Sequence, residues 1–212
     1  MTAQQEPWHE EGRAQRYARW RRISSWMVYA PFARKIVECL APLQARATIV
    51  DLGTGPGLFP IELSKLWPQA KIIGVDPSSE MLNIARNNAD EAGVSSFDTK
   101  VGTAEEIPIE SNSVDLVVTQ SSLHEWENPQ KGLSEIFRVL KPGGSLILKD
   151  YNRAWLSDWK RKLFGFFHHL DMFKFTFEEV AALLREAGFA EIRGDGRGLQ
   201  FFVQASKPTK AD

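Results

Sequence analysis

The stretch IVDLGTGPG, residues 49–57, decides the fold, because it joins a short apolar run to a glycine-rich turn and then to a helix-like segment. Gly53 and Gly55 allow a sharp turn where a side chain would clash, and Gly57 allows a ligand to lie close against the backbone. The helix that follows offers free N–H groups and partial positive charge to a polar or anionic group. The stretch predicts a strand–turn–helix unit with a ligand at its turn; a tight turn without a ligand is the alternative.

The segments around this turn continue the alternation of strands and helices. Near-continuous runs of Val, Ile and Leu are typical of parallel strands that are covered on both faces. Helical spacing and end signals separate these runs, as at Asn128-Pro129, where a cap and a first-turn proline begin a helix. The predicted strands are residues 47–51, 71–76, 97–102, 114–119 and 145–149; the predicted helices cover residues 57–67, the segment after 77–79, and the segment from 129 to a stop at 141–144.

The C-terminal part predicts a helix and two further strands. Thr176-Phe177-Glu178-Glu179 resembles a capping box, and Gly188 ends the helix that follows it. Residues 190–193 and 199–205 then predict a hairpin around a glycine-rich turn. The pattern as a whole predicts an α/β fold with one doubly wound, mostly parallel sheet, an antiparallel C-terminal edge, and a helical arm in front of it.

Composition excludes several classes of protein. Among 212 residues, 26 basic side chains balance 27 acidic ones, which argues against a protein built wholly around a polyanion. No apolar run reaches the roughly 18 residues of a membrane-spanning helix. The polar, acidic N-terminus resembles neither a secretory signal nor a transit peptide. Cys39 is the lone cysteine, which excludes an intrachain disulfide and a cysteine-based metal site. We therefore expect a cytoplasmic protein without a metal.

Asp76 is the acidic partner of the glycine turn. It ends the next predicted strand, at about the distance at which a carboxylate reaches the two hydroxyls of a ribose. A dinucleotide fingerprint would need a glycine at position 58, where Leu58 stands, so the glycine spacing departs from that motif. The alternative is that Asp76 and Pro77 only cap the following helix.

Five pieces of sequence make the chain resemble the class I S-adenosylmethionine-dependent methyltransferases, and most closely their small-molecule branch, which includes quinone-biosynthesis C-methyltransferases. The pieces, in the family's order and spacing, are VDLGTGPG (50–57), GVDPSSEML (74–82), GTAEEIP (102–108), SVDLVVTQSSLHEW (113–126) and FRVLKPGGSLIL (137–148). Such a series is far more specific than one glycine turn. The resemblance implies a Rossmann-like seven-stranded sheet and S-adenosyl-L-methionine as cofactor.

The sequence has no repeat, low-complexity tract or linker, which predicts one domain over residues 1–212, and the resemblance assigns roles to its parts. Its parts would be an arm or lid (1–45), a cofactor-binding core (47–150), an aromatic acceptor-side insertion (151–175), and a helix with the last strand pair (176–212). The implied cofactor-binding residues are Asp51, Gly53, Thr54, Gly55 and Gly57 at the methionine part, Asp76 at the ribose, Pro77, Met81, Ala104 and Glu105 around the adenine, and Gln120 at the sulfonium end. Thr103 stands where the family often has an aspartate for the adenine amino group, so Glu105 or a backbone carbonyl would take that role.

Methyl transfer from a sulfonium mainly requires that the nucleophile is held in line with the methyl group. A general base is needed only for a protonated, weakly acidic acceptor. His124 follows the fourth strand at the carboxyl edge and could serve as that base when neutral, or it could only pack or cap a loop. Asp150 and Tyr151 end the fifth strand on the same rim and are the other catalytic candidates. His168 and His169 would point about 100° apart in a helix, which argues against a shared metal.

Two variable segments leave the acceptor open. The N-terminal arm carries five arginines, which predict a solvated face, a lid over the cofactor, or a contact with RNA or anionic membrane; they are Arg13, Arg16, Arg19, Arg21 and Arg22. Residues 155–175 (WLSDWKRKLFGFFHHLDMFKF) predict an aromatic wall for a flat or lipophilic acceptor, or else core or dimer packing.

The main functional prediction is methyl transfer from S-adenosyl-L-methionine to a small, aromatic or lipophilic acceptor by in-line displacement. One alternative is an RNA-directed methyltransferase that uses the arginine-rich arm. Another is a non-catalytic protein that binds the cofactor or forms a homodimer through the aromatic segment. Residues 119–123 (TQSSL) lack the Asn/Asp-Pro-Pro-Tyr/Phe run of methyltransferases that act on adenine or glutamine amines, so nucleic acid is not the expected partner.

Overall fold

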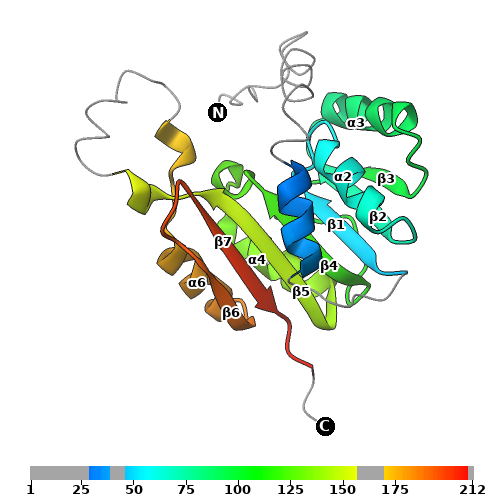
Figure 1. Ribbon diagram of the computed structural model, residues 1–212. Helices are drawn as coiled ribbons and strands as arrows, with labels where there is room; N and C mark the ends of the chain where they lie inside the picture. Colours follow the sequence, from blue (N-terminus) through cyan, green and yellow to red (C-terminus); the bar gives the residue numbers. More distant parts are fainter. Residues whose placement is uncertain (1–28, 39–45, 157–169, 210–212) are drawn as a thin grey trace, which may run out of the picture. The chain divides into compact units, whose positions relative to one another are not determined.

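A computed structural model describes residues 29–38, 46–156 and 170–209 of the chain (Figure 1). Its strands are β1 (Thr48–Leu52), β2 (Lys71–Asp76), β3 (Phe97–Val101), β4 (Val114–Gln120), β5 (Leu140–Tyr151), β6 (Ala190–Asp195) and β7 (Gln200–Ser206). Its helices are α2 (Leu58–Leu66), α3 (Ser79–Glu91), α4 (Pro129–Val139) and α6 (Phe177–Glu186), with single 3-10 turns η1 (Leu123–Glu125), η2 (Arg153–Trp155) and η3 (Leu170–Met172).

The strands form a seven-stranded sheet in the order β3-β2-β1-β4-β5-β7-β6. The pairs β1–β2, β2–β3 and β4–β5 are parallel, whereas β7 is antiparallel to both β5 and β6. The predicted α/β class, a mostly parallel Rossmann-like sheet with an antiparallel C-terminal edge, is therefore confirmed. The chain divides into two compact units, Met1–Gly102 and Thr103–Asp212.

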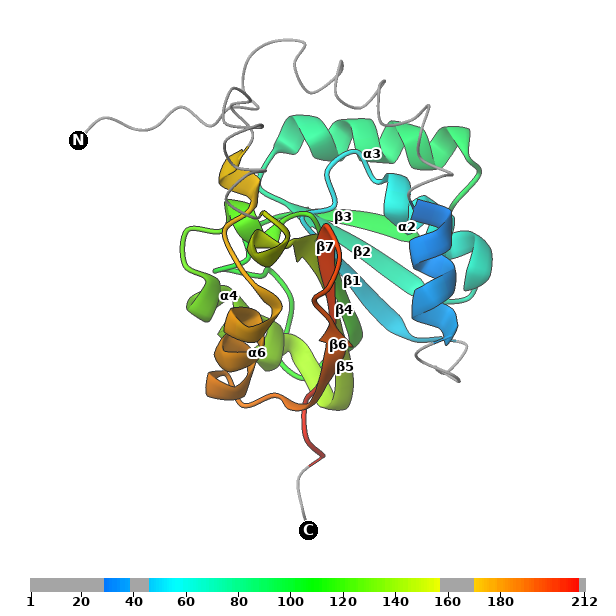
Figure 2. The ribbon, with the colours of Figure 1, turned by 60° about the vertical axis from the view of Figure 1, so that its left-hand side comes forward.

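The first unit carries the glycine-rich turn on β1. All of β1 after Thr48 and all of β2 after Lys71 are buried, as their near-continuous apolar runs predict, while β3 is half exposed. Helix α3 packs along β2 and β3 (Figure 2). Residues 29–38 are helical, and the rings of Tyr29 and Phe32 lie 6.3 and 5.3 Å from that of Phe59 on α2. This segment is the described portion of the predicted arm, whose five arginines lie outside the described residues.

The second unit contains β4 to β7, with α4 and α6 packed together. Asn128 accepts a hydrogen bond from the Lys131 N–H at the start of α4, as predicted. The capping box of α6 is also confirmed, because Thr176 Oγ1 accepts from the Glu179 N–H and Glu179 Oε2 accepts from the Thr176 N–H. The predicted C-terminal hairpin is present as β6 and β7.

The predicted start of β5 is wrong by five residues. The strand begins at Leu140 instead of Ser145, because Leu140 already pairs with Val114 while Ser145 pairs with Leu116. Residues 141–144 therefore lie opposite a single residue of β4. The glycines and proline of this segment do end α4, as predicted, but they form an irregular insertion within the strand and do not precede it.

Candidate functional site

The turn after β1 has the left-handed backbone that its glycines predict. The φ angles of Gly53, Gly55 and Gly57 are 76°, 51° and 72°. The N–H groups of Gly53 and Thr54 both donate to the Val75 carbonyl, at 2.8 and 3.1 Å, so the turn wraps over the last residues of β2. This contact places the glycine turn beside the carboxyl end of β2.

Asp76 points at the glycine turn. Its Oδ2 accepts the Gly55 N–H at 2.8 Å and its Oδ1 accepts the Ser78 N–H at 2.9 Å. Ser78 caps α3, because its Oγ accepts the Met81 N–H. The carboxylate therefore links the first turn to the second, while a serine carries out the capping. Each carboxylate oxygen can accept more than one hydrogen bond.

Gly55 and Gly57 serve different purposes. No atom of the described residues would lie within 4 Å of a Cβ placed on Gly55, so this part of the structure leaves the backbone there open to a ligand. A Cβ on Gly57 would lie 2.8 Å from Ala85 Cβ on α3 and 3.3 Å from the Phe97 ring. The close approach of a ligand that the sequence assigned to Gly57 thus suits Gly55 better, and Gly57 allows α2 to pack against α3.

Asp51 is a buried acid beside this turn, with 3% of its surface exposed. Burial raises its pKa to about 7; the Thr54 hydroxyl opposes this rise, and the charge of Asp76 adds to it. A cation placed beside Asp51 would favour its ionised form. Of the other predicted cofactor residues in this unit, Met81 is buried and Pro77 is exposed.

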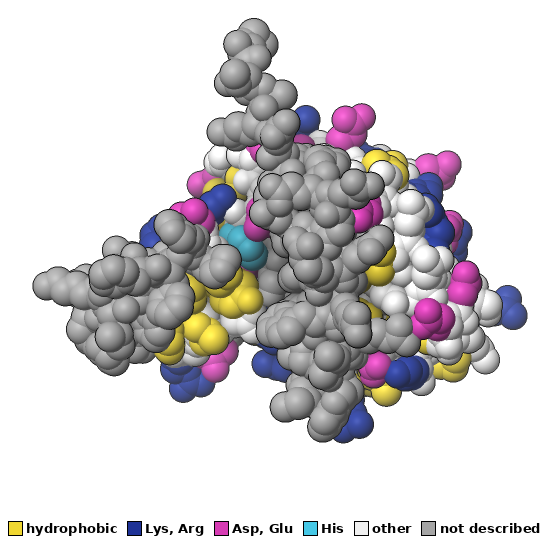
Figure 3. Space-filling model, turned by 90° about the horizontal axis from the view of Figure 1, so that it is seen from above, with side chains coloured by type: hydrophobic (Ala, Val, Ile, Leu, Met, Phe, Trp, Pro, Cys, Tyr) yellow, Lys and Arg dark blue, Asp and Glu magenta, His cyan; other side chains and the backbone are white. Residues whose placement is uncertain are grey.

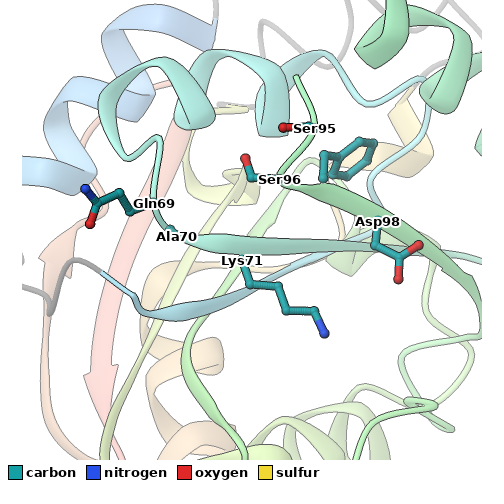
Figure 4. Close-up of a pocket in the computed structure, with 7 residues that line it drawn as sticks. Gln69, Ala70, Lys71, Ser95, Ser96 and Asp98 are labelled. Carbon is teal, nitrogen blue, oxygen red and sulfur yellow. The ribbon is translucent and has the colours of Figure 1, made fainter. Parts of the chain in front are cut away.

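The first unit therefore fits a nucleoside with a charged tail in three respects. It offers an open backbone at Gly55, a carboxylate aimed at that backbone, and a buried acid close to both. A separate hollow of about 260 Å³, lined by residues 69–71 and 95–98, lies at the amino ends of β2 and β3 (Figure 4). Ligands of open α/β sheets bind at the carboxyl ends, so this hollow is not part of the candidate site.

In the second unit, the predicted adenine and sulfonium contacts have distinct surroundings. Ala104 is buried, and Glu105 Oε1 accepts the Asn128 N–H at 3.0 Å, so this carboxylate is engaged at the start of α4. Gln120 ends β4, and its buried Oε1 has no hydrogen-bond partner among the described residues. Because a buried amide oxygen without a donor is costly, Gln120 is suited to accept a hydrogen bond from a ligand. Ser121 follows with a φ of 54°, a conformation that no sequence signal announced.

His124 is held between two carboxylates. Its Nδ1 lies 2.8 Å from Asp150 Oδ1, its Nε2 lies 3.3 Å from Glu125 Oε1, and its backbone N–H donates to Asp150 Oδ2 at 3.2 Å. Burial lowers the pKa of His124, but the hydrogen bonds and charges of Asp150 and Glu125 outweigh burial and raise it to about 9. His124 is therefore protonated at neutral pH. This state favours a hydrogen-bond donor over the neutral base that the sequence suggested.

A series of three aromatic rings, Tyr151, Phe173 and Trp155, begins at His124, and we call these three residues the aromatic ledge. The Tyr151 ring meets the His124 ring edge-on at 5.6 Å, Phe173 lies 5.5 Å from Tyr151, and Trp155 stacks on Phe173 at 6.4 Å. All three side chains are partly exposed. A histidine side chain is visible in Figure 3 with hydrophobic side chains beside it.

The structure thus brings together the three catalytic candidates His124, Asp150 and Tyr151. It adds Glu125, Trp155 and Phe173, whose roles the sequence left open. The remainder of the aromatic segment, residues 157–169 with His168 and His169, lies outside the described residues. Within the described ranges, no cluster of three acidic, histidine or cysteine side chains could hold a metal, and no helix is long and apolar enough to cross a membrane.

Comparisons with known proteins identify the domain and its relatives. Residues 50–148 match a family model described as a methyltransferase domain. The chain is 33% identical over 167 residues to a malonyl-[acyl-carrier protein] O-methyltransferase of Methylococcus capsulatus, covering 77% of this chain and 58% of that protein. It is 24% identical over 199 residues to a demethylmenaquinone methyltransferase of Listeria monocytogenes, covering 84% of each.

Solved structures agree on the fold. A putative S-adenosyl-L-methionine-dependent methyltransferase of Methanococcus maripaludis superposes with a TM-score of 0.80 and 22% identity, covering 100% of this chain and 99% of that one. The chain spans between 44% and 58% of the length of the first five curated relatives that it matches. The sheet order, the glycine turn with its aspartate, and the matching domain model together show that the chain belongs to the class I S-adenosylmethionine-dependent methyltransferases.

Proposed function

We propose that the chain transfers a methyl group from S-adenosyl-L-methionine to a small acceptor with a flat or lipophilic body. The observation that carries the proposal is the aim of Asp76 at the glycine turn, through its hydrogen bond with the Gly55 N–H. Burial of Asp76 beside an open turn favours a ligand with paired hydroxyl groups and a part that lies flat against the backbone.

In this proposal each group of the first unit has one task. Asp76 accepts the two ribose hydroxyl hydrogens, and the open backbone at Gly55 borders the methionine part. Asp51, whose pKa of about 7 reflects its burial, is ionised when the cofactor's ammonium group lies beside it. When bound, the cofactor supplies an electrophilic methyl group on a sulfonium.

The second unit supplies the acceptor side. The aromatic ledge offers partly exposed rings to a flat acceptor, and His124 offers an N–H donor next to them. The methyl transfer does not require a catalytic dyad, because alignment of the nucleophile with the methyl group accounts for much of the reduction of the barrier. Activity in the cytoplasm belongs to the same proposal, whereas a homodimer through residues 155–175 is the alternative use of that segment.

Two measurements test the proposal. Titration calorimetry with S-adenosylhomocysteine, the demethylated product, should give one saturable site per chain. An acceptor screen with isotope-labelled cofactor, over phenols, aromatic acids and quinols, should then give labelled product. Absence of heat with both the cofactor and its product would refute the proposal.

A further inference from the structure

The two carboxylate partners of His124 differ in how firmly they are held. The Asp150 side chain is 2% exposed and accepts hydrogen bonds from both the ring and the backbone of His124. The Glu125 side chain is 60% exposed, and its oxygen lies at the longer distance of 3.3 Å from Nε2. An exposed ion pair contributes little stability, because water screens it and two side chains lose freedom. Asp150 therefore fixes the ring, while Glu125 is a partner that another anion can replace.

Two cationic side chains, His124 and Lys174, favour a negative charge at the position of Glu125. The pKa of Glu125 is lowered by its hydrogen bond with His124 and, in addition, by the positive charges of His124 and Lys174, with burial opposing them. Lys174 is exposed and follows Phe173 of the aromatic ledge. Two cationic groups thus act on one carboxylate, next to a set of partly exposed rings.

We propose that Glu125 is an internal ligand of an anion subsite, and that the acceptor replaces it by placing its own anionic oxygen on His124 Nε2 while its flat body lies on the aromatic ledge. The anionic oxygen belongs to a carboxylate or to an ionised phenol or enol. This inference rests on the proposed function, since it names the acceptor class of the same enzyme. Asp150 is then a positioning residue that fixes the orientation of the imidazole ring.

The subsite can be tested without knowledge of the true acceptor. The full chain, labelled with ¹⁵N in its histidine rings, is titrated with benzoate, with 4-nitrophenolate at pH 8 and with uncharged benzamide, while the His124 Nε2 signal is followed by NMR. A His124→Asn variant, which keeps a group for Asp150 but lacks Nε2, assigns the signal among the 4 histidines. We expect saturable shifts with benzoate or nitrophenolate and none with benzamide; the two anions distinguish the carboxylate from the ionised hydroxyl.

Matched variants separate displacement of Glu125 from a general charge effect. Glu125→Gln removes the competing anion and should tighten anion binding roughly two- to fivefold, the worth of an exposed ion pair. Glu127→Gln removes the same charge from a nearby exposed residue and should leave the affinity unchanged. His124→Asn should weaken anion binding by about tenfold or more, as loss of a hydrogen bond to a charged group does.

Three results would overturn the subsite: equal shifts with benzamide and benzoate, no shift in either the native chain or Glu125→Gln, or equal effects of Glu125→Gln and Glu127→Gln. Calorimetry with S-adenosylhomocysteine on the same samples keeps the two proposals apart. If that nucleoside binds and the anions do not, the subsite is wrong and the methyl-transfer proposal stands. If neither it nor S-adenosyl-L-methionine binds, the proposed function fails whatever the anions do.

Discussion

At the scale of single residues, Asp76 should determine the affinity for S-adenosyl nucleosides. Asp76→Asn replaces one acceptor oxygen with an NH₂ group, which cannot accept a ribose hydroxyl and would face the Gly55 or Ser78 N–H. We expect S-adenosylhomocysteine to bind about 10- to 100-fold more weakly, the usual cost of hydrogen bonds to a charged group. Titration calorimetry measures this loss. Asp98→Asn, an exposed change on β3, is the control; native affinity in Asp76→Asn would refute the ribose assignment.

The charge of His124 depends on Asp150. Asp150→Asn removes a carboxylate 2.8 Å from Nδ1, so the pKa of His124 should fall from about 9 toward its usual 6.5. Glu125 remains and keeps part of the rise. An NMR titration of the histidine rings gives the value directly. As a control, Tyr151→Phe keeps the ring that contacts His124 and should leave the pKa of His124 unchanged. A His124 pKa that stays near 9 in Asp150→Asn would show that Asp150 does not cause the rise.

Sequence predicted some of these residues and could not predict the state of others. The glycine spacing and the position of Asp76 at a strand end were sufficient to predict the turn and its acidic partner. The protonation of His124 was beyond reach, because its buried partner lies 26 positions away and only the pairing of β4 with β5 brings the two together. The strained backbone of Ser121 was also invisible, since serine does not mark left-handed conformations.

At the scale of elements, the packing of α2 against α3 depends on Gly57. A methyl group there would lie 2.8 Å from Ala85 Cβ, in addition to the strain of a φ of 72°. Gly93→Ala is the matched control, because its φ of 68° carries the same strain but its surroundings are open. We expect Gly57→Ala to lower the free energy of unfolding by about 1–3 kcal/mol more than Gly93→Ala, the usual cost of overpacking. Urea unfolding measures the free energy of unfolding of both variants. Equal decreases in the two variants would show that α3 shifts away from the added methyl group without loss of stability.

The elements that the sequence predicted best are those whose signals are local. The capping box of α6 and the cap of α4 need only three or four neighbouring residues, and both were predicted correctly. The start of β5 was not, because the pairing of Leu140 with Val114 is decided by the neighbouring strand, and pairing resumes only at Ser145, after the insertion at residues 141–144. A proline and two glycines predict that no strand forms at these positions, and this local signal does not reveal that Leu140 pairs with the neighbouring strand.

At the scale of the whole molecule, two groups make stability fall as pH rises. The pKa of Asp51 is raised from 3.8 to about 7 in the folded state, so its contribution is complete below 3.8 and is lost as pH rises through 7. His124, raised from 6.5 to about 9, contributes fully below 6.5 and loses that contribution as pH rises through 9.

Without cofactor, the free energy of unfolding should therefore decrease between pH 5 and pH 9. The part due to Asp51 is on the order of 2 kcal/mol between pH 5 and 7. Urea unfolding at a series of pH values measures the slope, which Asp51→Asn should flatten below pH 7 and His124→Asn above it. Stability that increases over this range would contradict both assignments.

The fold class and the family follow from the sequence because they rest on repeated signals. Five motif-bearing pieces and a run of buried strands point to the same sheet, and the domain match at residues 50–148 covers all five pieces. The division into one domain remains a prediction. The acceptor could not be predicted, because the side chains that we propose for it, His124 on η1, Tyr151 on β5 and Phe173 after η3, meet only in three dimensions.

The insertion at residues 141–144 is a suitable place to attach the protein to a surface. It lies at the amino end of β5, and Asp150 and Tyr151 lie at the other end of the same strand, roughly 20 Å away at the rise of an extended chain. Pro142 is exposed. An epitope or a dye-bearing peptide inserted there would attach the protein to a sensor surface and leave Asp150 and Tyr151 at the end of β5 away from that surface. Acceptors could then be screened on immobilised protein.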